Sequence, residues 1–564
     1  MMRSTETALE LEDNGRPSLN PTSASGENEP PHQAEGTSTS NTAVLARGIV
    51  VSNTVQYAHG MRLLMIMTSL LLTFFTVLLD TSIIATAIPK ITDEFGELGD
   101  VSWYGSAFLM TMGGTQSAWG KMYKHFSPKM GFLTAVLIFE ITSAVCGAAP
   151  NSTALIIGRA LAGVGAAGVA NGTFTIIALI VEPKQLATYT GITAITSAGS
   201  AALGPLIGGV LADKLTWRWC FYINPPIGAV AVPFVVFFLR IPAYNTDQKS
   251  SERTIRLRDK VMQIDPVGIV LVMGGIIAFI QALHYGGLSK SWSSVTVVSL
   301  LVGSVVTGLA FASWEWRQSE HAAIPPRLMA NHNIFVQSLY TAFLAGSSFT
   351  VIYYLPIYFQ SIADVSATMS AVRNLPMIIS LNITIIISSV FSSKTGTKPL
   401  LVVGAGLATV GCGLLNTLDI GSAAGKWVGY QLLVGIGFGI SFQLPIIIAQ
   451  NTAALADIGP ATAIILFFQT VGAAFFLAAA QSAFLNQILL KLRNSAPGVD
   501  PATLIATGSA QLRSVFTAEE MPGILTAYMS GLKATFVLAT CGSGVAFIVA
   551  LFSKHKPLST HTSP

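Results

Sequence analysis

Long apolar runs recur along this chain, and each is long enough for a helix to cross the hydrocarbon layer of a membrane. Such a helix needs roughly 20 residues, because its backbone groups must find their hydrogen bonds within the segment when no water is present. About fourteen runs of this kind occur, at residues 63–89, 102–122, 130–149, 154–181, 188–212, 219–239, 266–285, 293–314, 334–358, 369–392, 399–418, 427–450, 459–486 and 530–552. They predict an all-α polytopic membrane protein with about 14 transmembrane helices.

The composition agrees with that of an integral membrane protein. Charged residues make up 10% of the chain and hydrophobic residues 51%, whereas soluble domains carry roughly 25% charged residues. A net charge of +4 is too small to indicate nucleic acid, and no basic run is interleaved with aromatic residues. The four cysteines lie in apolar segments without paired spacing, which is typical of buried thiols. We expect no nucleic acid, no metal and no cofactor.

The polar segments predict how the chain is oriented. Residues 1 to about 58 are rich in Ser, Thr, Pro, Glu and Asn and lack an apolar core, so we predict a disordered tail. Lys and Arg favour the cytoplasmic side of a membrane, and they gather at residues 121–129 and in the loop 241–264. Both termini, including the tail 554–564, are therefore predicted to be cytoplasmic, with an extracellular loop at about 487–528. The cell membrane is the expected location and the vacuolar membrane the alternative.

This orientation places Asn151 outside the cell, near the start of a predicted helix. It begins the triplet Asn-Ser-Thr, which is an acceptor sequence for N-linked glycosylation. Asn151 is therefore a candidate glycosylation site.

Three ionisable residues, Asp80, Glu140 and Arg159, lie inside apolar runs. Each charge at bilayer depth costs about 2.5–3.5 kcal/mol on insertion scales, so it indicates function unless it is paired. Asp80 is the best candidate for a proton carrier, although it could instead pin neighbouring helices. Arg159 could respond to the protonation of an acid or form a permanent pair; its partner could be Asp80, Glu140 or a backbone carbonyl. Glu140 could carry a proton or remain a neutral acid at a helix surface.

The predicted fifth helix contains Gly-Pro-x-x-Gly-Gly, with the residues Ser200, Gly204, Pro205, Gly208 and Gly209. Glycine allows two backbones to approach and proline bends a helix, so the run could simply be a tightly packed, kinked helix. The string also closely resembles the fifth-helix signature of antiporters in the major facilitator superfamily.

Further segments extend that resemblance to fourteen-spanning drug:proton antiporters, and within them to fungal toxin-efflux carriers such as those for HC-toxin and aflatoxin. These segments are Leu79-Asp80-Thr81-Ser82, Gly158-Arg159-Ala160-Leu161-Ala162-Gly163, Phe139-Glu140-Ile141, Trp217-Arg218-Trp219 through Asn224-Pro225-Pro226, and Tyr353-Tyr354-Leu355-Pro356.

The resemblance implies a fold of two six-helix halves plus two extra central helices. The halves would span residues 59–240 and 317–553, and the extra helices residues 265–316. It also implies export of a small amphipathic molecule, such as a fungal secondary metabolite, toxin or drug, in exchange for protons, by a protein that works as a monomer.

Two motifs depart from the family pattern, at three positions. Lys124 stands where the loop between the second and third helices usually carries an aspartate, and Ser127 replaces its second glycine. For this loop, the only family feature that we expect here is its basic character. Ala162 also replaces a glutamine found in many members.

A short internal similarity links the fourth and twelfth runs. Arg159-Ala-Leu-Ala-Gly163-Val-Gly165 lines up with Gln431-Leu-Leu-Val-Gly435-Ile-Gly437. Many transporters consist of repeated halves with the substrate site between them. If this match marks such a repeat, two helices must lie between the halves; chance in a glycine-rich chain is the alternative.

A cavity between the halves would need polar and aromatic side chains that bind a ligand without a large desolvation cost. Candidates within the helices are Gln116, Gln443, Gln469, Phe442 and Phe468. Packing is the alternative fate of each aromatic residue.

The sequence disfavours several other functions. No Walker motif for ATP is present, since the nearest string, at residues 421–427, is one residue short and ends in Trp427. The eight histidines lie mostly in tails or loops, which disfavours an intramembrane enzyme. Two alternatives remain. One is an uptake transporter for a siderophore or nutrient, and the other is a transport-inactive sensor.

Overall fold

The computed structural model describes residues 57–95, 101–240, 265–287, 290–319, 322–365, 367–507 and 512–554. Nearly all of the predicted tails and the whole loop 241–264 lie outside these residues. Ala58, at the end of the predicted N-terminal tail, already belongs to the fold: it is buried, and its amide donates a hydrogen bond of 2.9 Å to the carbonyl of Ile180.

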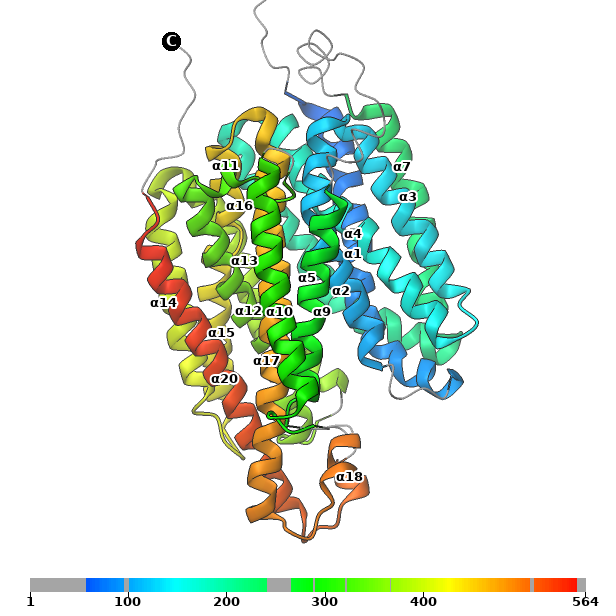
Figure 1. Ribbon diagram of the computed structural model, residues 1–564, viewed down its shortest axis with the longest axis vertical. Coiled ribbons are helices and arrows are strands. Elements are labelled where there is room, and N and C mark those ends of the chain that lie inside the picture. The colour runs from blue at the N-terminus through cyan, green and yellow to red at the C-terminus, as the bar shows by residue number, and fades with distance from the viewer. Residues whose placement is uncertain are drawn as a thin grey trace, which may run out of the picture. The chain divides into compact units, whose positions relative to one another are not determined.

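The described part of the chain is helical, without a named strand. The first half contains α1 (Gly60–Phe95), α2 (Val101–His125), α3 (Pro128–Gly147), α4 (Ser152–Ile180), α5 (Pro183–Lys214), α6 (Trp219–Tyr222) and α7 (Asn224–Phe238). Then follow α9 (Pro266–Tyr285), α10 (Val295–Gln318) and α11 (Pro326–Met329). The second half contains α12 (His332–Ser361), α13 (Ala367–Thr395), α14 (Thr397–Leu415), α15 (Ala424–Ser441), α16 (Leu444–Thr452), the 3₁₀ turn η4 (Leu455–Asp457), α17 (Ile458–Ser495), α18 (Pro501–Ala506), α19 (Leu512–Val515) and α20 (Met521–Leu551). Figure 1 shows the halves side by side.

The predicted all-α membrane fold is confirmed, and the number of spans is only partly settled. Twelve helical segments of the described chain are long and apolar enough to cross a membrane. The helices α2 and α5 match two further predicted runs and have 25 and 32 residues, but they are not among the twelve. Both pack against the other half, α2 on α17 and α5 on α13, which reduces their need for lipid-facing apolar residues. Fourteen spans therefore stays a prediction.

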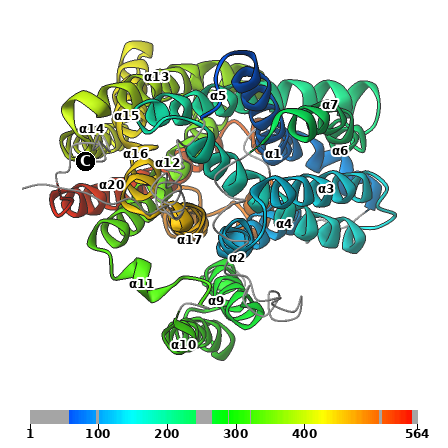
Figure 2. The same ribbon diagram turned by 90° about the horizontal axis from the view of Figure 1, so that it is seen from above.

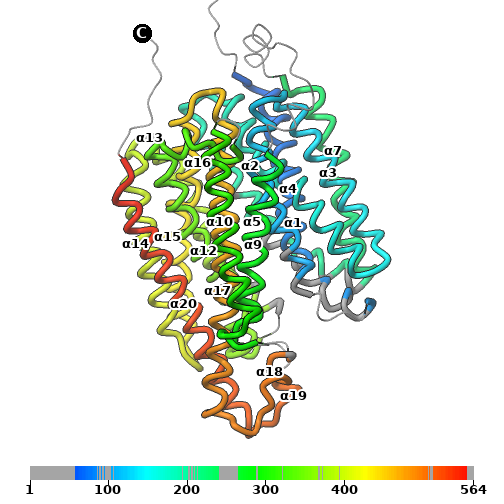
Figure 3. The backbone as a smooth tube through the Cα atoms, in the orientation of Figure 1, coloured from blue at the N-terminus to red at the C-terminus, as the bar shows by residue number. Residues whose placement is uncertain are grey.

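The predicted loop at about 487–528 contains more helix than its composition indicates. α17 continues to Ser495 and α20 already begins at Met521, so helix occupies both ends of that range. The backbone trace in Figure 3 shows α17 and α20 extending together, with α18 and α19 between their ends. Val499, Leu504 and Leu512 are buried in this segment. The polar composition of the segment did not predict this packing.

The two halves repeat the same arrangement of helices. α4 packs on α2 and α3, as α15 packs on α13 and α14; α1 packs on α5 and α7, as α12 packs on α17 and α20. A Cβ at Gly163 would overlap α2, and one at Gly435 would overlap α13. A Cβ at Gly165 would likewise overlap α3, and one at Gly437 would overlap α14. The Gly-x-Gly match therefore marks a true structural repeat, in which glycine allows close backbone contact.

The helices α9 and α10 are central in the chain order but peripheral in the bundle, as Figure 2 shows. α9 contacts both α2 and α17, so it covers the junction between the halves on one side. Met273 of α9 packs against Gly114, and Phe279 lies 4.5 Å from Phe475, measured between ring centroids. α10 packs on α9 and leaves most of its side chains exposed, as expected for a helix that faces lipid.

Asp265 fixes the start of α9 to the end of α10. Its carboxylate accepts hydrogen bonds from the Gly268 amide at 2.9 Å, the Trp314 Nε1 at 2.8 Å and the Ala323 amide at 3.2 Å. Burial opposes ionisation of this carboxyl, but the hydrogen bonds together lower its pKa below the ordinary value. These hydrogen bonds therefore tie the two peripheral helices together as a hairpin.

Candidate transport site

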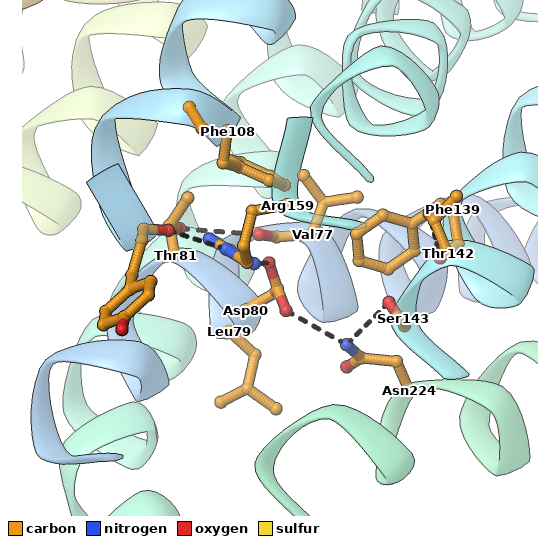
Figure 4. A network of polar contacts seen from close by, with 12 residues as sticks. Val77, Leu79, Asp80, Thr81, Phe108, Phe139, Thr142, Ser143, Arg159 and Asn224 are labelled. Carbon is orange, nitrogen blue, oxygen red and sulfur yellow. Dashed lines mark hydrogen bonds and ion pairs between the residues drawn. The ribbon is translucent and has the colours of Figure 1, made fainter. Parts of the chain in front are cut away.

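A buried ion pair between Asp80 of α1 and Arg159 of α4 lies inside the first half (Figure 4). Each residue is only 1% exposed. Arg159 Nη1 donates to Asp80 Oδ2, and Arg159 Nε donates to the carbonyl of Tyr104 at 2.9 Å. Two of the three partners considered for Arg159 are therefore present together, namely Asp80 and a backbone carbonyl. Such a pair is tolerated in a dry interior only when its geometry and its other hydrogen bonds offset desolvation.

Aromatic rings complete the surroundings of the guanidinium group. The Cζ atom of Arg159 lies 4.4 Å from the centroid of the Phe108 ring and 5.7 Å from that of Phe221. A ring face attracts a cation, and the attraction is stronger when water is excluded. Neither Phe108 nor Phe221 was predicted from the sequence. For Phe108 there was a signal, because Tyr104 and Phe108 are four residues apart and therefore lie on one face of α2.

Asn224, the first residue of α7, connects the ion pair to α3. Its Nδ2 lies 3.4 Å from Asp80 Oδ1 and 3.3 Å from Ser143 Oγ, and Figure 4 shows it between these two groups. α1, α3, α4 and α7 therefore meet through one polar network. The only sequence signal for Asn224 was its place before Pro225 and Pro226 in the motif that opens the predicted sixth helix.

Glu140 has no hydrogen bond or ion pair with Asp80 or Arg159 among the described residues, and its carboxyl group lies against α7. Both carboxyl oxygens are buried and have no hydrogen-bond partner among the described residues. The side chain packs directly on Gly228, where an added Cβ would overlap Oε1.

The α5 signature packs against α1 beside Asp80. A Cβ at Gly204 would overlap the Ser82 hydroxyl, which also donates to the carbonyl of Ser200 at 3.0 Å. The hydroxyl of Ser200 in turn lies 3.3 Å from the carbonyl of Phe75. Gly208 is buried. The predictions for Pro205 and Gly209 lie outside the described side chains.

The predicted cavity residues are distributed over different contacts. Gln116 is fully buried, and neither atom of its amide has a partner among the described residues. Gln443 reaches across the halves, with Nε2 at 3.4 Å from the Thr193 hydroxyl, while its Oε1 has no described partner. Phe442 packs on the core of the second half, whereas Phe468 packs on a cluster that joins the halves.

Gln469 is half-buried on α17, next to Phe468. Asn151, the glycosylation candidate, is exposed and caps α4, where its Oδ1 accepts from the Ala154 amide at 2.9 Å. No described contact tests either assignment, so both stay predictions.

Contacts between the halves gather toward the end of the bundle that carries the α2–α3 turn. Lys124 Nζ lies 2.7 Å from Asp457 Oδ1, and Arg327 Nη2 lies 2.9 Å from Asp457 Oδ2. Lys124, which replaces the usual acid of this loop, thus pairs with an acid of the second half. An apolar cluster that includes Phe174 and Ile465 continues this contact.

Two repeated helical halves, joined by a peripheral hairpin and holding a buried charge network, define a membrane carrier. The sequence profile of the Major Facilitator Superfamily matches residues 70–477. The chain therefore belongs to the major facilitator superfamily of transporters.

Similar proteins agree with this assignment. The chain is 47% identical to the MFS-type transporter grgE of a Penicillium species over 88% of this chain and 87% of that protein. It is 38% identical to the efflux pump roqT of Penicillium rubens, covering 88% and 92%. Among solved structures it resembles the proton:xylose symporter XylE, with a TM-score of 0.56 and 14% identity, covering 88% of this chain and 97% of that one. The likeness to XylE concerns the fold alone.

Proposed function

We propose that this protein exports a small amphipathic molecule in exchange for protons. The Asp80–Arg159 pair carries this proposal, because a buried carboxylate with a permanent cationic partner supplies a protonatable group inside the bundle. Relatives that match most of the chain are named efflux pumps, including MFS1 of Trichophyton rubrum at 39% identity, and their names favour export over uptake.

Protonation of Asp80 would change the balance of charge around Arg159. In the ionised state the carboxylate neutralises the guanidinium group. A neutral Asp80 no longer does so, and a buried cation left without any counter-charge costs about 3–5 kcal/mol. A conformation in which water reaches Arg159 then becomes favourable. Proton binding would thereby promote the rearrangement of α1, α4 and α7 around the site.

The halves would rock about a central substrate site to alternate access. In the conformation described, they meet toward the end with the α2–α3 turn, through the Lys124–Asp457 pair and the apolar cluster. With both termini in the cytoplasm of a cell-membrane protein, this end is the cytoplasmic one, and the conformation is closed to the cytoplasm. Gln116, Gln443, Gln469, Phe442 and Phe468 would contact the substrate as the halves separate.

Dye accumulation in inside-out vesicles tests the proposed exchange. Rhodamine 6G, a permanently charged amphipathic dye, should accumulate when the vesicle interior is acidic, and collapse of the pH gradient should stop this. Vesicles with the double variant Asp80→Asn/Arg159→Gln provide the background. Accumulation that persists after the gradient is collapsed would rule out proton coupling, and proton-driven loss of dye would indicate the opposite direction.

A further inference from the structure

Glu140 is a half-buried acid whose carboxyl oxygens are buried, and it takes no part in the Asp80–Arg159 pair. Its two oxygens lack hydrogen-bond partners among the described residues, and its side chain lies against Gly228 of α7. An ionised carboxylate in such a place needs a counter-charge, since an unpaired buried charge is far more costly than an unpaired neutral polar group.

The cation in this part of the bundle is already engaged. Arg159 donates to Asp80 and to the Tyr104 carbonyl, and its guanidinium group lies over the Phe108 ring. While Asp80 is ionised, the stable form of Glu140 is therefore the neutral acid.

The two acids are joined through facing turns of α3 and α7. Glu140 and Ser143 are three residues apart on α3, and Asn224 and Gly228 are four residues apart on α7, so each pair shares a helical face. Gly228 contacts Glu140, while Asn224 contacts both Ser143 and Asp80. The contact between Glu140 and Gly228 therefore lies one turn of α7 away from Asn224, whose side-chain amide bonds to Asp80.

We propose that Glu140 is a second proton-binding group, and that Asp80, Glu140 and Arg159 hold one proton between them. Transfer of that proton breaks the O–H bond of Glu140 and forms one on Asp80. Glu140 then becomes the carboxylate, and Arg159 becomes its counter-charge. The charge of the three groups together stays at zero in both forms.

Asn224 and Ser143 are positioning residues in this account, because they hold α3 and α7 in register with Asp80. This inference rests on the proposed proton exchange, but its first test does not require transport.

Infrared spectroscopy of the purified protein in lipid tests whether Glu140 carries a proton. Glu140→Gln should remove one band of a protonated carboxyl group at neutral pH. Ser143→Ala should shift the pH at which this band disappears. Thr142→Val is the matched control and should leave the band unchanged. Among the described residues, the Thr142 hydroxyl bonds only to the carbonyls of Ile138 and Phe139 on its own helix. An unchanged spectrum of Glu140→Gln would overturn the proposal.

Rhodamine 6G accumulation in inside-out vesicles separates this inference from the proposed function. Glu140→Gln should lose the dependence of accumulation on the pH gradient while the protein stays folded. If wild type is driven by the gradient and Glu140→Gln behaves identically, the role of Glu140 is refuted and the proposed function stands. If wild type ignores the gradient but the infrared band depends on Glu140, the proposed exchange fails and the proton-binding site stands.

Discussion

Glycines bring helices close both within each half and between the halves, but the contact between the halves also includes polar side chains that reach across it. Within the halves, Gly165 and Gly437 bring backbones so close that a Cβ would overlap the neighbouring helix. Between the halves, Gly120 of α2 packs just as closely on Ala463 of α17. Gln443 reaches across to Thr193 with an amide oxygen that lacks a described partner. Close glycine packing gives rigid units, whereas an unsatisfied polar group costs roughly 1–3 kcal/mol and gains when water or a ligand reaches it. Polar groups without partners at the contact between the halves therefore suit surfaces that separate.

The largest expected effect is at the ion pair within the first half. Asp80→Asn leaves Arg159 unpaired, so we expect a loss of about 3–5 kcal/mol in stability together with loss of transport. The double variant Asp80→Asn/Arg159→Gln should recover most of the stability, because no buried charge remains, but it should not recover transport. Thermal unfolding in detergent and dye accumulation in vesicles measure the two properties. Full transport by either variant would refute the assigned role.

Overpacking of a glycine contact should come next. Gly437→Leu forces a side chain into the backbone of α14, which we expect to cost about 1–3 kcal/mol or more and to lower the amount of folded protein in the membrane. Gly429→Leu on the same helix is the control, because nothing lies within 4 Å of a Cβ there. Equal abundance of the two variants would argue against close packing within this half.

A change at Gln116 should raise the stability of the described conformation instead of lowering it. Gln116→Leu removes two buried polar atoms without partners, so we expect the described conformation to gain about 1–2 kcal/mol and the turnover of dye to fall. The thermal midpoint and the transport rate should therefore move in opposite senses. A lower midpoint would show that the Gln116 amide is satisfied in the protein.

The smallest effect is expected for the partly buried ion pair between the halves. Lys124→Asp places like charges opposite Asp457 and should weaken the closed end by about 1 kcal/mol or less, because Lys124 is partly solvated. We expect faster maleimide labelling of a cysteine placed at Thr193. Glu94→Gln, which breaks the Arg218–Glu94 pair inside the first half, should leave the labelling rate unchanged. If both variants accelerate labelling, the pair between the halves has no special role.

Much of this fold could be predicted from sequence, because length and apolarity alone define a spanning helix. All fourteen predicted runs fall on helices, and the Gly-x-Gly match revealed the repeat. The ends of α17 and α20 within residues 487–528 were missed, because the predicted apolar runs stop at residue 486 and start again only at residue 530.

The site was predicted only in part. Asp80 and Arg159 stood out because charges are costly in lipid, and they proved to be partners. Asn224 and Ser143 are common polar residues whose role depends on which helices meet, and that tertiary information is absent from a local pattern.

Distances between spin labels test most directly whether the halves move as rigid units. Cysteines at Thr153 and Leu215 report within the first half, and cysteines at Leu215 and Ile420 report between the halves; the exposed Cys541 is replaced by serine in both variants. On acidification in the presence of rhodamine 6G, the distance distribution between the halves should shift while the one within the first half stays fixed. A shift within the first half, or an unchanged distance between the halves, would contradict the account.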